Sequence, residues 1–181
     1  MNNRRGRQEM GSASDCHYPQ KWKPPDVGRL KLNVDASVHV NAADFSIGLI
    51  LRDHMGQFVA GKVKCIARSG NVLEAKATAI LEGLKWIVDM NYRNVEVESD
   101  SLVSVKAIQN GSENFLEVGH LFEDCRAYFK SRGDLSISFV KRQANKVAHL
   151  AARFPCLPDC QNIFLSSPSI LLETLMYDVS F

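Results

Sequence analysis

Residues 72–88, VLEAKATAILEGLKWIV, have the apolar spacing of an amphipathic helix. Their leucine, isoleucine, alanine and valine residues recur at intervals that place them on one face of a helix. In the segments before residue 72, apolar and polar residues alternate as they do in strands. The fold class depends on this change of period and on the elements to either side of it.

Three segments before the helix are predicted to form an antiparallel meander. In RLKLNVDASV (29–38) apolar and polar residues alternate, which puts Asp35 at the strand's end on the face opposite the leucines. The next segment, FSIGLILRD (45–53), is almost continuously apolar and is therefore expected to be central. A turn at HMGQ (54–57) then leads into FVAGKVKCIAR (58–68), which completes a hairpin.

After the helix, predicted strands and helices alternate. The segments are strand NVEVESD (94–100), helices SLVSVKAIQNG (101–111) and HLFEDCRAYFKSRG (120–133), strand LSISFVKR (135–142) and helix ANKVAHLAARF (144–154). A meander followed by this alternation predicts an α/β fold with a mixed sheet and helices on its faces.

The two ends of the chain are predicted to lie outside this domain. Residues 1–28 are polar and contain three prolines, so we expect a disordered leader before a domain at 29–154. The tail, 155–181, contains Ser167 and Pro168, which are typical of a helix start before the apolar segment SILLETLMY (169–177).

Composition restricts the partners and the compartment. The chain of 181 residues is 45% hydrophobic, and its net charge of +2 does not by itself indicate nucleic acid. No apolar run is long enough to span a bilayer, so we expect no membrane partner. Five cysteines, an odd number with scattered spacing, favour a reducing intracellular compartment, nuclear or cytoplasmic. The arginines in MNNRRGRQEM (1–10) are also compatible with an organellar transit peptide, so an organellar location stays an alternative.

Three acidic residues stand where predicted elements begin or end: Asp35, Glu74 and Asp100. Because neighbouring parallel strands end on the same side of a sheet, Asp35 and Asp100 come together if their strands are adjacent. Clustered carboxylates need a counter-charge, and their hard oxygens select Mg²⁺ or Mn²⁺. Each acid also has a structural explanation: Glu74 in a capping box with Asn71, Asp100 as a helix cap, and Asp35 in a turn.

Four segments resemble, in order, the motifs of type 1 ribonuclease H. They are LNVDAS (32–37), EAKATAILEGL (74–84), VEVESDS (95–101) and ANKVAHLAAR (144–153). Within that family the chain looks like the ribonuclease H-like domains of plants that derive from, or resemble, reverse-transcriptase retroelements. KWKPP (21–25) and the apolar tail helix are also similar to those proteins, so the resemblance covers about residues 22 to 181.

The resemblance implies a fold and an activity. The family fold is a five-stranded mixed sheet flanked by helices, in agreement with the element order above. The family hydrolyses the RNA strand of an RNA–DNA hybrid with two Mg²⁺ ions, Mn²⁺ being an alternative, one activating water and the other stabilising the leaving oxygen. For this chain the resemblance implies that Asp35, Glu74 and Asp100 are catalytic metal ligands. It also implies that RNA–DNA hybrid is the partner, and we expect the protein to be a monomer.

The resemblance also implies substrate contacts. The family often has an asparagine three residues before its glutamate that contacts the minor groove, so Asn71 is expected to touch substrate as well as cap the helix. Lys141 or Arg142 would contact phosphate. Ser37 and Asn145 complete the predicted set.

The last family motif departs from the pattern, because His149 stands where the family has its fourth acid. Three interpretations are open. His149 is a ligand better suited to Mn²⁺ or Zn²⁺ than to Mg²⁺, a general acid or proton shuttle, or a surface histidine on a domain with weakened catalysis.

The sequence therefore supports three functional hypotheses. The first is an RNA–DNA hybrid endonuclease, weakened where the fourth acid is lost, with Asp35, Glu74, Asp100 and His149 as its catalytic residues. The second is a non-catalytic nucleic-acid-binding module derived from a retroelement ribonuclease H. The third is an interaction domain that binds a partner through Leu171, Leu172 and Leu175 of the tail helix.

Overall fold

A computed structural model describes residues 21–38, 44–111, 117–155, 157 and 159–179. The strands are β1 Leu30–Val38, β2 Phe45–Arg52, β3 Phe58–Ile66, β4 Val95–Ser99, β5 Leu135–Phe139 and β6 Gln161–Phe164. The helices are α1 Val72–Asp89, α2 Leu102–Asn110, α3 Gly119–Ser131, the short 3₁₀ helix η1 Arg142–Asn145, α4 Lys146–Ala152 and α5 Ser169–Val179.

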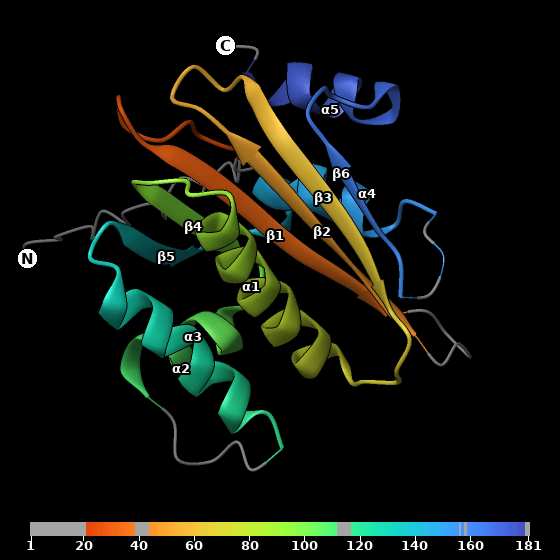
Figure 1. Ribbon diagram of the computed structural model, residues 1–181. Helices are drawn as coiled ribbons and strands as arrows, with labels where there is room; N and C mark the ends of the chain where they lie inside the picture. Colours follow the sequence, from red (N-terminus) through yellow and green to blue (C-terminus); the bar gives the residue numbers. More distant parts are fainter. Residues whose placement is uncertain (1–20, 39–43, 112–116, 156, 158, 180–181) are drawn as a thin grey trace, which may run out of the picture.

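The strands form a single sheet in the order β5-β4-β1-β2-β3-β6. β1, β2 and β3 are the predicted antiparallel meander, while β4 runs parallel to β1 and to β5. Helices α1, α2 and α3 cover one face, and α4 and α5 the other (Figure 1). The predicted α/β class and mixed sheet are confirmed.

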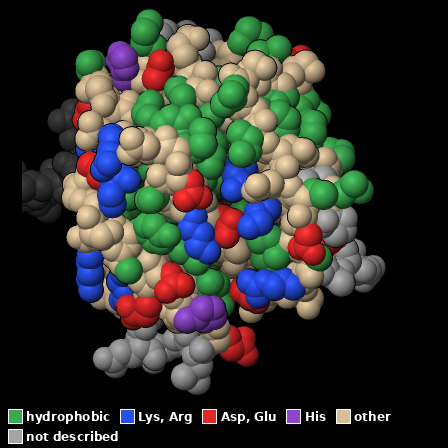
Figure 2. All heavy atoms as spheres, in the orientation of Figure 1, with side chains coloured by type: hydrophobic (Ala, Val, Ile, Leu, Met, Phe, Trp, Pro, Cys, Tyr) green, Lys and Arg blue, Asp and Glu red, His purple; other side chains and the backbone are tan. Residues whose placement is uncertain are grey.

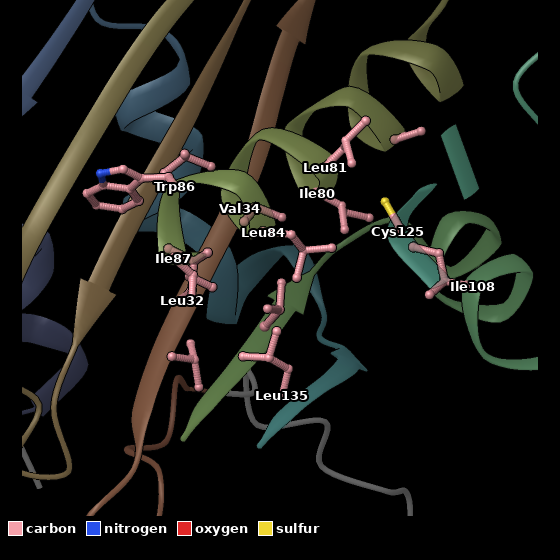
Figure 3. Packing of buried hydrophobic residues seen from close by; sticks show 14 of the residues in the cluster. Leu32, Val34, Ile80, Leu81, Leu84, Trp86, Ile87, Ile108, Cys125 and Leu135 are labelled. Atoms are coloured by element: carbon pink, nitrogen blue, oxygen red, sulfur yellow. The ribbon is translucent and has the colours of Figure 1, made fainter. Parts of the chain in front are cut away.

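The main core lies between the sheet and α1. Leu32 and Val34 of β1 pack against Ile80, Leu84 and Ile87 of α1, all of them fully buried (Figure 3). The alternation in β1 produces this arrangement, because every second side chain points to the α1 face. The intervening residues, Asn33 and Asp35 among them, are directed to the α4 face.

The predicted number of strands is wrong, because among the described residues the sheet has six strands and not five. The additional strand is β6, which comes from the segment expected to be a tail and pairs antiparallel with the β3 edge. Its side chains are mostly exposed, so the sequence has little apolar alternation there. The hydrogen-bonded pairing with β3 makes this segment a strand, although its own sequence has little strand-like alternation.

Both predicted tails contribute to the fold within the described residues. Residues 1–20 of the expected leader lie outside that range, but Trp22 is only 2% exposed, so the leader does not extend to 28 as expected. In α5, Leu171 and Leu175 are buried with Ile50 and Val63 of the sheet. The third hypothesis required both leucines to bind a partner. Because they are buried within this chain, they are not available for that contact. None of the described helices is both long and apolar enough to cross a membrane.

Candidate active site

Asp35 and Asp100 meet at one edge of the sheet. The parallel pairing of β1 with β4 ends at Val34 and Ser99, and Asp35 and Asp100 are the residues that directly follow this last pair in the chain. α1 begins at the same end of the sheet (Figure 1). Both side chains are nearly inaccessible, at 0% and 8% exposure. The sequence-based expectation that these two acids come together is confirmed.

The cation between these two carboxylates is the ammonium group of Lys76. Its Nζ donates to Asp35 Oδ1 and to Asp100 Oδ1. Lys76 lies on α1 and is itself only 13% exposed. Sequence reasoning missed this residue, although its position three residues after Leu73 and four before Ile80 places it on the sheet-facing side of the helix.

Glu74 lies two residues before Lys76 but has a different partner. The Asn71 side chain accepts from the Glu74 backbone N–H at 2.9 Å, which confirms Asn71 as the helix cap. The Glu74 carboxylate accepts from Arg68, a residue that the sequence analysis did not single out. Asn71 itself is exposed beside Glu74.

His149 connects the site to Arg142. Its Nδ1 is 2.9 Å from Asp35 Oδ2 and its Nε2 is 3.0 Å from the Arg142 guanidinium. Because arginine only donates, Nε2 must accept, and the ring proton must be on Nδ1, where it donates to Asp35. His149 is therefore a neutral imidazole with both nitrogens engaged. It is neither a core residue nor an isolated surface histidine.

Gly48 brings α4 close enough for this contact. It pairs with Asp35 across the β1–β2 ladder. A Cβ at this position would lie 2.3 Å from the Ala152 nitrogen and 2.6 Å from the Ala148 carbonyl oxygen. Only a glycine lets the α4 backbone lie this close to the sheet, and this close packing places His149 beside Asp35.

A buried polar network supports the site from the α4 face. The Asn145 amide donates to the Val34 carbonyl at 2.9 Å and its Oδ1 accepts from Asn33 at 3.1 Å. Asn33 also donates to Glu98, whose pKa is raised by burial although Lys31 and Asn33 oppose the shift. Asn145 is 1% exposed, so its geometry is that of a structural residue and not of the substrate contact expected from the sequence.

The two aspartates present oxygen donors of the kind that bind a divalent cation. Two carboxylates that converge on one cationic position are suitable ligands for one hard ion. Within the described part of the chain, however, no three His, Cys, Asp or Glu side chains are grouped as metal ligands. Glu74 is bonded to Arg68, and both nitrogens of His149 are occupied. As arranged, the Asp35 and Asp100 oxygens could hold one divalent ion at the place of the Lys76 ammonium group.

Residues 33–154 match the family model described as reverse transcriptase-like. A curated protein of Arabidopsis thaliana, named a ribonuclease H protein by inference, is 28% identical over 133 residues. The aligned region is 74% of this chain but 21% of that relative, so the chain spans about a fifth of the relative's length.

Solved structures show the same fold. The RNase H1 of the archaeon Halobacterium salinarum has a TM-score of 0.63 at 23% identity, over 70% of this chain and 96% of its own. LC11-RNase H1 in complex with RNA/DNA hybrid has a TM-score of 0.60 at 18% identity, over 69% and 94%. At these identities the likeness establishes the architecture alone.

Proposed function

The chain belongs to the reverse transcriptase-like family, and on this premise we propose that it is a ribonuclease H-type hydrolase of RNA–DNA hybrids. One observation carries the proposal: Asp35 and Asp100 converge on a single cationic position at the end of two parallel strands. Hydrolysis of a phosphodiester needs concentrated positive charge beside the reacting phosphate. Two acids that share one cation can form the binding site for that positive charge.

Asp35 and Asp100 would hold the ion, and Glu74 would join them after releasing Arg68. Mg²⁺ is the proposed ion and Mn²⁺ the alternative. When bound, it would supply Lewis-acid stabilisation of the charge on the phosphate. The protein residues around it fix the ligands: the Ala36 backbone N–H donates to Asp35 Oδ1 at 2.7 Å, and His149 holds the other oxygen.

The proposed substrate contacts are the polar side chains around this edge. Asn71 and Arg142 are exposed, and Ser37 is half-buried two residues after Asp35. On the face shown in Figure 2, basic side chains lie among acidic ones without a large patch of one sign. We therefore propose that a monomer binds hybrid through local contacts at the site, and that its affinity falls with salt only modestly.

A cleavage assay tests the activity. The purified chain is incubated with an RNA–DNA hybrid labelled on the RNA strand, with Mg²⁺ or Mn²⁺, and with an all-DNA duplex as the control substrate. Cleavage of the hybrid alone is expected, and Asp35→Asn should abolish it. If a demonstrably folded sample cuts nothing with either metal, the proposed activity is excluded.

A second candidate function is hybrid binding without turnover. It is favoured by two specific features: Lys76 stands between the acids, and a neutral histidine replaces the fourth acid. Fluorescence anisotropy with the labelled hybrid separates the two functions. Binding without cleavage supports the binding module, whereas an absence of binding at low salt contradicts both functions.

A further inference from the structure

We propose that Lys76 is a resident counter-ion that a divalent cation must displace, so that this one side chain sets the metal concentration at which the site becomes loaded. The inference deepens the proposed function and rests on it, because it takes Asp35 and Asp100 as cation ligands. It concerns binding of the ion, however, and can be measured without any cleavage.

The burial of the two acids makes a counter-charge necessary. A carboxylate removed from water is stable only when it is paired and hydrogen-bonded. Asp35 is 0% exposed, and its other neighbours are the Ala36 N–H and a neutral His149. Lys76 is thus the cation that balances Asp35, and Asp100 shares it.

Other basic side chains near the site have partners of their own. Arg68 is bonded to Glu74, and Arg142 to His149. In the part of the chain that the structure describes, neither arginine donates to Asp35 or Asp100. Lys76 therefore occupies the position at which a divalent ion would meet the same two oxygens, and both cannot be there together.

The attachment of Lys76 to α1 makes it an effective competitor. Its helix neighbours Ala75 and Ala77 are fully buried, so the backbone that carries the lysine is fixed against the sheet. A tethered ammonium group is present at a high effective concentration, which a free ion in solution must exceed. The stem of lysine is flexible, so the group can move to solvent once it is displaced.

Mn²⁺ binding tests this inference directly. Electron paramagnetic resonance measures the free Mn²⁺ that remains in solution with the parent protein, with Lys76→Met and with Lys85→Met. Lys85→Met is the control, because the Lys85 side chain lies on the same helix and is 47% exposed. Lys76→Met is expected to bind Mn²⁺ tighter than the parent by a factor on the order of ten. Its Tm should fall without metal and recover with Mn²⁺, while Lys85→Met behaves as the parent. Equal Mn²⁺ affinity in the parent and Lys76→Met would overturn the proposal.

Lys76→Gln is the second variant, because it removes the charge but keeps two hydrogen-bond donors. If either variant folds only when Mn²⁺ is added, the proposal is supported. If both stay unfolded with Mn²⁺ present, Lys76 is a structural cation that no metal replaces, and the proposal is wrong. If Lys76→Met gains Mn²⁺ affinity but no protein cuts hybrid, only the ribonuclease activity fails.

Discussion

His149 holds its place in the site through a chain of two hydrogen bonds. Arg142 donates to Nε2, and the proton on Nδ1 is donated to Asp35. A carboxylate at this position would place a second negative charge beside a buried acid. The imidazole of His149 instead donates to Asp35, orients it and needs no metal for stability.

His149→Asp is expected to act in opposite directions on stability and on activity. Without metal, the new carboxylate repels Asp35 and lowers the free energy of unfolding by about 1–2 kcal/mol. With Mg²⁺, the added ligand should raise hybrid cleavage on the order of tenfold. Urea denaturation and the cleavage assay measure the two effects, with His120→Asp on the exposed face of α3 as the control. A variant no more active than the parent would show that the missing acid is not what limits turnover.

Asp134 provides a pH-dependent test at residue scale. Hydrogen bonds from Arg132, and then from the Asn94 backbone, hold the pKa of Asp134 well below its usual range. Because the folded-state pKa is lowered, the stabilisation is present above the unfolded pKa of about 4 and is lost as the pH falls below it.

Asp134→Asn should therefore lower Tm most near neutral pH, and its difference from the parent should shrink progressively below about pH 4. Thermal unfolding across this range measures the difference. Asp124→Asn, an exposed change on α3, is the control. A difference that stays constant down to acid pH would exclude the Arg132–Asp134 pair as its source.

The sequence predicted the acidic residues of the site more successfully than their partners. Asp35 and Asp100 were predicted because alternation and parallel strand order are local patterns that determine where strand ends meet. Lys76 and Arg68 were not, since both look like ordinary helix or loop cations until the folded chain places an acid beside each. The buried role of Asn145 likewise depends on Asn33, which is distant in sequence.

At the scale of elements, the distance between α4 and the sheet decides whether His149 reaches Asp35. The backbone of α4 lies over Gly48, where a methyl group would overlap the Ala148 and Ala152 backbone. Backbone atoms cannot rotate away as a side-chain end can, so the helix itself must shift.

Gly48→Ala is expected to destabilise the fold by about 1–3 kcal/mol and to weaken the His149–Asp35 contact. Urea denaturation gives the first value, and the ¹⁵N chemical shifts of the His149 ring report the second. Gly133→Ala is the matched control, because a Cβ there meets nothing within 4 Å. A well-folded Gly48→Ala protein with unchanged histidine shifts would contradict the close-packing argument.

Elements with long apolar repeats were predicted from sequence, and those that depend on a neighbour were not. α1, with its buried face, and β2, which is buried throughout, carry their periodicity in the chain itself. β6 is short and mostly exposed, and it exists as a strand because β3 offers an unpaired edge. Local propensity cannot encode a partner that is distant in sequence.

At the scale of the whole molecule, one buried arginine connects both ends of the described chain to the sheet. The Arg52 guanidinium carbon lies 3.4 Å from the Trp22 ring centroid, and its nitrogens donate to Asp178 and Asn33 at 2.8 Å each. Burial lowers the pKa of Arg52, and the hydrogen bond with Asp178 opposes this shift. The segment before β1 and helix α5 are therefore integral to the domain.

Removing one partner of a buried ion pair leaves the other charge uncompensated, which costs more than the pair itself contributes. Asp178→Asn should therefore lower the free energy of unfolding by about 3 kcal/mol, measured by urea denaturation. Glu173→Gln, an exposed change on the same helix, should stay within about 0.5 kcal/mol of the parent. Deleting residues 166–181 removes Asp178 and uncovers Ile50 and Val63, so the truncated chain should be less stable still and prone to aggregate. A soluble, monomeric truncated chain of parental stability would instead mean that α5 is dispensable for the fold, which would reopen α5 as a surface for a partner.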